Sequence, residues 1–176
     1  MPGHRRSIRL RGYDYSRGGA YFVTICTDRG RCLLEHGGVR EMIGSTWQAL
    51  PGRFERVTVD AFIIMPNHVH GVVFLAPRTP PCGSNSTSSP PTSLPDVVQW
   101  FKSLTTARYR QAIRDSAWHP FGGHLWQRNY YERIIRNDDE LFQIREYITN
   151  NPKSWECDRE NPDRIDENDI YEWLYS

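Results

Sequence analysis

Three features are scarce in this chain: paired cysteines, long apolar runs and net charge. The four cysteines include no CxxC pair, so neither a disulfide framework nor a cysteine-bound zinc site is expected. No run approaches the roughly 20 apolar residues that a membrane-spanning helix needs. The arginine-rich beginning lacks the apolar segment of a secretory signal. We therefore expect a cytoplasmic chain that does not bind a membrane.

The net charge of +1 conceals an uneven distribution along the chain. Seven arginines lie between residues 5 and 31, whereas eight acidic residues lie between residues 156 and 172. This asymmetry predicts that the basic part contributes to a face that binds a polyanion and that the acidic part stays away from this face. Arg29 and Arg31 alone fit the solvation of a loop. Phosphate contact is the better interpretation for one cluster: Arg5, Arg6, Arg9 and Arg11.

The length of 176 residues is about that of one domain. We predict one catalytic domain over residues 1–155 and a separate acidic tail over residues 156–176. Residues 76–95 are rich in Pro, Ser, Thr and Gly, which predicts a flexible insertion within the domain.

The pattern of apolar and β-branched residues predicts both strands and helices. Strands are expected over residues 20–27, 56–65, 68–75 and 126–135, with a helix as the alternative for the last. Helices are expected from Gly37 to a stop at Pro51-Gly52, over 96–114, and from Asn137 or Asp138 to Pro152. The tight link between the second and third strands predicts an antiparallel hairpin. The sum is an α+β fold, an antiparallel sheet with helices on one face.

Two histidines, His68 and His70, are the sharpest chemical feature. Side chains two residues apart on a strand point to the same face, where two imidazoles can share one metal ion. The same face carries Val72 and Phe74, which predicts that a helix covers it. The pair follows a Pro-Asn turn, at a rim where a ligand can enter. A pair of buried histidines with only local hydrogen bonds is the open alternative.

Tyr147 and Asn151 are four residues apart in the last predicted helix and share one of its faces. An Asn151 oxygen with two imidazoles would suit Mg²⁺ or Mn²⁺ better than a closed zinc site. The proline after Asn151 disfavours helical geometry there, which leaves its direction open. Tyrosine, with a pKa of about 10, is a poor nucleophile at neutral pH, and a metal that polarises the phosphate lowers the barrier to its attack. Taken alone, Tyr147 fits core packing, and Tyr130 and Tyr131 fit structural or DNA-stacking roles.

Three segments resemble one family of transposases. Residues 65–73 (MPNHVHGVV) resemble the His-hydrophobic-His motif of the HUH-superfamily single-tyrosine, IS200-like transposases. Residues 4–27 (HRRSIRLRGYDYSRGGAYFVTICT) and 125–152 (LWQRNYYERIIRNDDELFQIREYITNNP) resemble the REP-associated tyrosine transposases. The resemblance runs from His4 to about Trp155.

This resemblance implies a ferredoxin-like HUH fold with the two histidines on a central strand. It implies Tyr147 as the nucleophile and Asn151, where the wider superfamily carries Gln, as the third metal ligand. It also implies cleavage of single-stranded DNA near a palindromic hairpin, a 5′-phosphotyrosine intermediate, a free 3′-OH and resolution by strand transfer. The expected partner is hairpin DNA, bound by a monomer or homodimer with Mg²⁺ or Mn²⁺.

The cations that we expect to contact DNA are Arg5, Arg6, Arg9, Arg11, Lys102, Arg108, Arg128 and Arg133. Two other functions stay open. One is a domesticated protein that binds DNA hairpins without cleaving them. The other is a metal-dependent phosphodiesterase that activates water in place of tyrosine.

Overall fold

Four antiparallel strands form one sheet in the order β2-β3-β1-β4. The strands are β1 (Gly19–Cys26), β2 (Val57–Ile64), β3 (His68–Leu75) and β4 (Tyr131–Ile135). The computed structural model describes Asp14, residues 17–77, 92–115 and 118–164, and Leu174. Strand β3 is central, with hydrogen-bonded neighbours on both sides. The predicted hairpin of β2 and β3 and the central place of the two histidines are confirmed.

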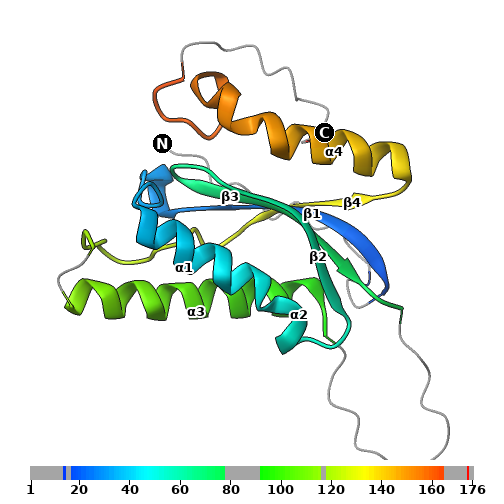
Figure 1. Ribbon diagram of the computed structural model, residues 1–176, viewed down its shortest axis with the longest axis horizontal. Helices are drawn as coiled ribbons and strands as arrows, with labels where there is room; N and C mark the ends of the chain where they lie inside the picture. The colour runs from blue at the N-terminus through cyan, green and yellow to red at the C-terminus, as the bar shows by residue number, and fades with distance from the viewer. Residues whose placement is uncertain (1–13, 15–16, 78–91, 116–117, 165–173, 175–176) are drawn as a thin grey trace, which may run out of the picture.

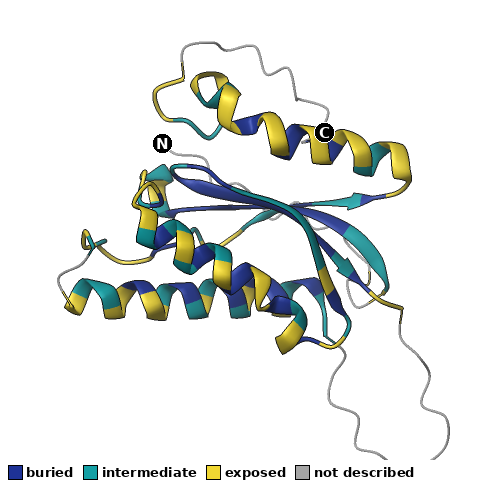
Figure 2. Ribbon diagram, in the orientation of Figure 1, coloured by how far each residue is buried: buried dark blue, intermediate teal, exposed yellow. Residues whose placement is uncertain are grey.

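Helices cover both faces of the sheet (Figure 1). Helices α1 (Gly37–Gln48) and α3 (Leu94–Arg114) pack on one face, and α4 (Asp138–Asn150) packs on the other. The predicted antiparallel α+β class is confirmed, but the expectation of helices on only one face was wrong. The reason is that the central strands are apolar on both faces. In β1, Val23 points to the core under α1 and α3, whereas Phe22 points to α4. Figure 2 shows β1 and β3 mostly buried between the two helix layers.

Two element boundaries differ from the sequence prediction. Helix α1 ends at Gln48, and Pro51 lies in the first turn of a short helix, α2 (Leu50–Arg53), rather than stopping α1. A first helical turn tolerates proline because its N–H would have no partner there. The predicted strand over residues 126–135 begins only at Tyr131, and Trp126 forms an isolated bridge to the residue that follows β1.

Helix α3 begins at Leu94, inside the range of 76–95 that we predicted as a flexible insertion. Ser93 and Asp96 form a capping box at this helix start, which explains why it begins before the apolar pattern does. Residues 78–91 of the predicted insertion lie outside the described residues. None of the helices in the described ranges combines the length and the apolar character needed to cross a membrane.

Helix α4 is attached to both edge strands of the sheet. The side chain of Asn137 accepts a hydrogen bond from the backbone N–H of Glu140 and so caps the helix start. The Glu140 carboxylate accepts a hydrogen bond of 2.7 Å from Arg133 of β4. At the opposite edge, Arg145 donates a hydrogen bond of 3.0 Å to Asp60, where the register of β2 and β3 shifts. These contacts fix the side chains that α4 presents to the central strands.

Gly71 in β3 allows the indole of Trp47 to lie directly on the sheet. A Cβ atom at Gly71 would stand 2.4 Å from Cζ2 of Trp47. Trp47 is fully buried, stacked on Phe62 and packed edge-on against Phe101, so its ring cannot move aside freely.

We predict that Gly71→Ala lowers the free energy of unfolding by about 3 kcal/mol, the upper end of typical overpacking costs. Urea denaturation followed by circular dichroism measures this change. Gly44→Ala is the matched control, because no atom lies within 4 Å of the added Cβ atom. An unchanged unfolding midpoint for Gly71→Ala would contradict the packing of Trp47 on β3.

Candidate metal centre and active site

His68 and His70 point their Nε2 atoms at one place on the α4 face of the sheet. Both side chains are fully buried, and their Nε2 atoms are 2.8 Å apart. Two ligands about 2.1 Å from one ion, at about a right angle, are about 3 Å apart. The observed separation is therefore close to that of two imidazoles sharing a cation.

The other ring nitrogen of each histidine has a fixed partner. Nδ1 of His68 lies 2.8 Å from Oδ1 of Asn67, whose Nδ2 donates to the carbonyls of Gly30 and Glu160. Because Nδ2 is the donor, Oδ1 must accept, so Nδ1 of His68 carries the proton and Nε2 keeps its lone pair. Nδ1 of His70 lies 2.9 Å from the Thr24 hydroxyl. Such partners orient the imidazoles that bind metals.

Asn67 was expected only as a turn residue, and the structure places it as a positioning residue for His68. We predict that Asn67→Ala weakens Mn²⁺ binding by about 10- to 100-fold, because the His68 ring loses the partner that fixes its tautomer. Calorimetric titration measures the affinity. The exposed Asn150 provides the control, since Asn150→Ala should not change it. Equal affinities for both variants would contradict the role of Asn67.

Burial lowers the pKa of both imidazoles. For His70 the pKa falls well below its usual value, because the neighbouring His68 adds to the effect of burial. For His68, burial lowers the pKa although the carboxylates of Asp158 and Glu160 oppose the shift. Both rings are therefore neutral at neutral pH, which is the form that binds a metal.

Tyr147 of α4 brings its hydroxyl to the histidine pair. The hydroxyl oxygen is 3.1 Å from Nε2 of His70, and the side chain is only 4% exposed. Its ring packs edge-on against Phe22 of β1 and against His70. Tyr147 thus lies beside the place at which the two imidazoles converge.

Two further oxygen-bearing side chains lie at the site. Oδ2 of Asp158 is 3.8 Å from Nε2 of His68, and His68, His70 and Asp158 each offer a ligand atom within 4.8 Å of the others. Asn151 is 2% exposed, and within the described part of the chain its Oδ1 has no hydrogen-bond partner. Its φ of −52° and ψ of −41° are helical despite the following proline. A buried oxygen without a partner and a carboxylate beside two imidazoles fit a hard divalent cation.

Sequence reasoning missed Asp158 because it lies in the range that we set apart as an acidic tail. Two acidic residues of that range, Asp158 and Glu160, lie close to His68 instead. Asp158 is buried, and the carboxylate of Glu160 accepts a hydrogen bond of 3.5 Å from the thiol of Cys26. One reason to expect a further acidic ligand lay in the sequence: two imidazoles and an amide are neutral and leave the charge of a divalent cation uncompensated. Eight acidic residues in that range offered no basis for a choice.

Comparison with known proteins indicates the family of this chain. Residues 86–151 match the family model described as transposase IS200 like. A Haemophilus influenzae protein without an assigned function is 37% identical, over 89% of this chain and 92% of its own length. The chain belongs to the IS200-like transposase family.

One solved structure shows that the chain has a fold known from a transposase. A REP-associated tyrosine transposase bound to a REP hairpin aligns with a TM-score of 0.54 and 20% identity, over 88% of this chain and 74% of that one. A Deinococcus radiodurans chain assigned as a transposase aligns with a TM-score of 0.49 and 21% identity, over 81% and 95% of the two chains.

The family match spans α3, β4 and α4, and so contains Tyr147 and Asn151. The two histidines precede the matched residues. The fold brings them to Tyr147 across the sheet, and this IS200-like transposase therefore has its imidazoles and its tyrosine in one buried place.

The expected DNA contacts are placed unevenly. Arg128 is exposed, whereas Lys102 donates to the carbonyl oxygens of Gln127 and Asn129 and so holds that loop. The remaining two cations of the described part have protein partners as well: Arg108 donates to Thr46, and Arg133 to Glu140. Four more lie outside the described residues: Arg5, Arg6, Arg9 and Arg11.

Proposed function

We propose that this transposase cleaves and rejoins single-stranded DNA through a covalent tyrosine intermediate. The observation that carries the proposal is the hydroxyl of Tyr147 at 3.1 Å from the convergent imidazole pair. His68 and His70 would hold Mg²⁺ or Mn²⁺ together with an oxygen of Asp158 or Asn151. Four candidate ligands from three parts of the chain support one metal centre at this place.

A bound divalent cation would polarise the scissile phosphate and neutralise the charge that develops on it. Tyr147 attacks the phosphorus, the bond from phosphorus to the 3′ oxygen breaks, and a 5′-phosphotyrosine forms. The phenolic proton leaves to solvent, and the departing 3′ oxygen takes up a proton to become a free 3′-OH. Attack by a 3′-OH on the phosphotyrosine reverses these changes, which rejoins the strand without an external energy source.

A basic groove on α3 supports the binding of the DNA backbone. A cavity of about 500 Å³ lies between α3 and residues 124–128 and is lined by Lys102, Arg110, His124 and Arg128, among others. Cations along a groove neutralise successive phosphates and bind DNA without reading its sequence. We assign Arg128, which is exposed at this groove, to such a contact. The hairpin bound by the REP-associated transposase makes a palindromic hairpin the substrate that we propose here.

The geometry also favours action by a single chain. Helix α4 packs on the sheet of its own chain, and Tyr147 reaches His70 within that chain. A monomer thus contains the whole proposed site, and a homodimer is not required for its assembly.

A covalent adduct is the decisive test of this function. We expect a labelled DNA hairpin with single-stranded flanks to give a detergent-resistant protein–DNA adduct in Mn²⁺ or Mg²⁺, and none in EDTA. Tight binding without an adduct would indicate a domesticated hairpin-binding protein. Release of a free 5′-phosphate without an adduct would indicate a phosphodiesterase that activates water.

A further inference from the structure

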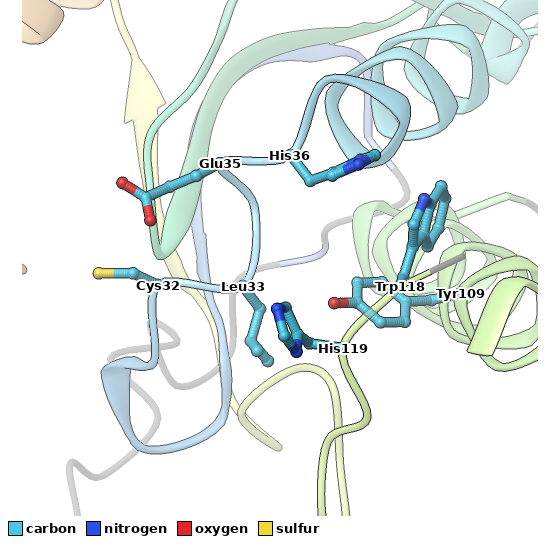
Figure 3. A pocket seen from close by; sticks show the side chains of 7 residues that line it. All are labelled: Cys32, Leu33, Glu35, His36, Tyr109, Trp118 and His119. Atoms are coloured by element: carbon cyan, nitrogen blue, oxygen red, sulfur yellow. The ribbon is translucent and has the colours of Figure 1, made fainter. Parts of the chain in front are cut away.

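A second cavity, shown in Figure 3, adjoins the core cluster on the face of the sheet opposite α4. Its volume is about 450 Å³. The loop before α1 and the end of α3 form its walls, together with the segment that follows α3. Its lining residues are Cys32, Leu33, Glu35, His36, Tyr109, Trp118 and His119.

Two aromatic rings form one wall of this cavity. The ring centroids of Tyr109 and Trp118 are 5.0 Å apart, at an interplanar angle of 66°. Trp118 is partly exposed, so its indole is accessible to a ligand. Gly38 at the start of α1 leaves room for that indole, because a Cβ atom there would lie 3.3 Å from it. An accessible indole beside a cavity is a surface on which a planar ring can stack.

The Tyr109 hydroxyl faces this cavity and forms no hydrogen bond with the described residues. The side chain is 2% exposed, and the hydroxyl points into the cavity toward Leu33 and His119 (Figure 3). Burial raises the pKa of Tyr109, so the hydroxyl stays protonated and able to donate. A hydroxyl at the wall of a cavity can donate a hydrogen bond to a ligand that enters it.

Other polar groups around the cavity can read the edge of a heterocycle. Nδ1 of His36 accepts from the backbone N–H of Gly38, which leaves its Nε2 to donate. Glu35 offers acceptors, and His119 offers either role. A planar ring with donors and acceptors on its edge fits this combination.

We propose that this cavity binds an unpaired nucleobase of the DNA, stacked on Trp118 and hydrogen-bonded by Tyr109. The proposal rests on the proposed function, since DNA supplies the base. It adds a base-reading site on the face opposite the tyrosine, so the DNA contacts both faces of the sheet.

The test measures the affinity for fluorescein-labelled, mixed-sequence single-stranded DNA by fluorescence polarisation in EDTA, where no cleavage occurs. We expect Trp118→Ala to weaken binding about tenfold, the usual effect of losing one base stack, and Trp118→Phe to restore most of it. Phe142→Ala is the matched control, because Phe142 is an aromatic residue 60% exposed on α4. Wild-type affinity in Trp118→Ala would overturn the proposal.

Two measurements keep the test valid if Trp118→Ala folds poorly. Tyr109→Phe removes only the hydroxyl and should weaken binding severalfold with an unchanged melting temperature. In the unaltered chain, DNA should slow alkylation of the exposed Cys32 at the cavity rim. An unprotected Cys32 together with normal binding by Tyr109→Phe would overturn the proposal, as would binding of free deoxynucleotides that DNA does not displace.

The two proposals fail in different ways. If the wild type gives no adduct but Trp118→Ala weakens DNA binding, the proposed activity is wrong and the base site is supported. If the wild type gives the adduct but Trp118→Ala and Tyr109→Phe bind DNA as tightly as the wild type, the proposed activity is supported and the base site is wrong.

Discussion

Replacing Tyr147 by Phe should reduce the covalent protein–DNA adduct to background while DNA affinity stays within about twofold. Only the hydroxyl oxygen is removed, and this is the atom that lies 3.1 Å from Nε2 of His70. A tyrosine that forms the covalent bond has no substitute once that oxygen is gone. The ring remains, so its edge-on contacts with Phe22 and His70 persist and the fold should not change. Gel electrophoresis after incubation with labelled hairpin DNA and Mn²⁺ measures the adduct.

Tyr130→Phe and Tyr131→Phe are the matched controls, because these two residues were the other tyrosines considered from the sequence. The Tyr131 hydroxyl donates to the carbonyl of Leu174, which gives it a structural role. Both variants should form the adduct at wild-type level. An adduct that survives Tyr147→Phe and disappears in either control would move the nucleophile to β4 or to the segment before it.

Replacing His70 by Ala should abolish the stabilisation that Mn²⁺ gives to the folded chain. In the wild type, an ion at 100 times its dissociation constant adds about 2.7 kcal/mol to the free energy of unfolding, if the unfolded chain does not bind it. His70 supplies one of the two convergent nitrogens, so its loss leaves His68 and the oxygens without a second imidazole. His68→Ala should have the same effect. Adduct formation should fall with metal binding in both variants.

The measurement compares melting curves of each variant with and without Mn²⁺. Because the comparison is made within one variant, the cost of the cavity left by the missing imidazole cancels. His124→Ala serves as the control, since His124 is exposed on the α3 side of the sheet. A full metal-dependent shift in His70→Ala would contradict a metal centre at this pair.

The local parts of the fold could be predicted from the sequence. Strand β3 was predicted with its exact bounds, because the Pro66-Asn67 turn precedes a run of branched and aromatic residues. The start of α4 at Asn137 or Asp138 and its end before Pro152 could be predicted for similar reasons, since capping and proline act within one turn. The spacing of His68 and His70 on a strand was enough to predict that both side chains point to the same face of the sheet.

The distant parts of the site could not be predicted. Asn67 donates hydrogen bonds to Gly30 and Glu160, which are separated from it by 37 and 93 positions in the sequence. No local sequence pattern contains such contacts. Asp158 reaches His68 only because residues 151–157 form a 3₁₀ segment that follows α4 around the site. The side of the sheet on which α4 packs depends on which strand face is left uncovered by α1 and α3. Arg133 was predicted to contact DNA, but the fold pairs its guanidinium with the carboxylate of Glu140.

The separation of the site along the chain has a consequence for synthesis. His70 precedes Tyr147 by 77 residues, so strand β3 with its two histidines leaves the ribosome long before the tyrosine does. A nascent chain that has formed the β2–β3 hairpin carries the imidazoles and has no hydroxyl to attack a phosphate. On the mechanism proposed here, a protein fragment that ends before α4 can bind a cation at most weakly and cannot cut DNA, and strand cleavage begins only with a chain that has been translated past its tyrosine.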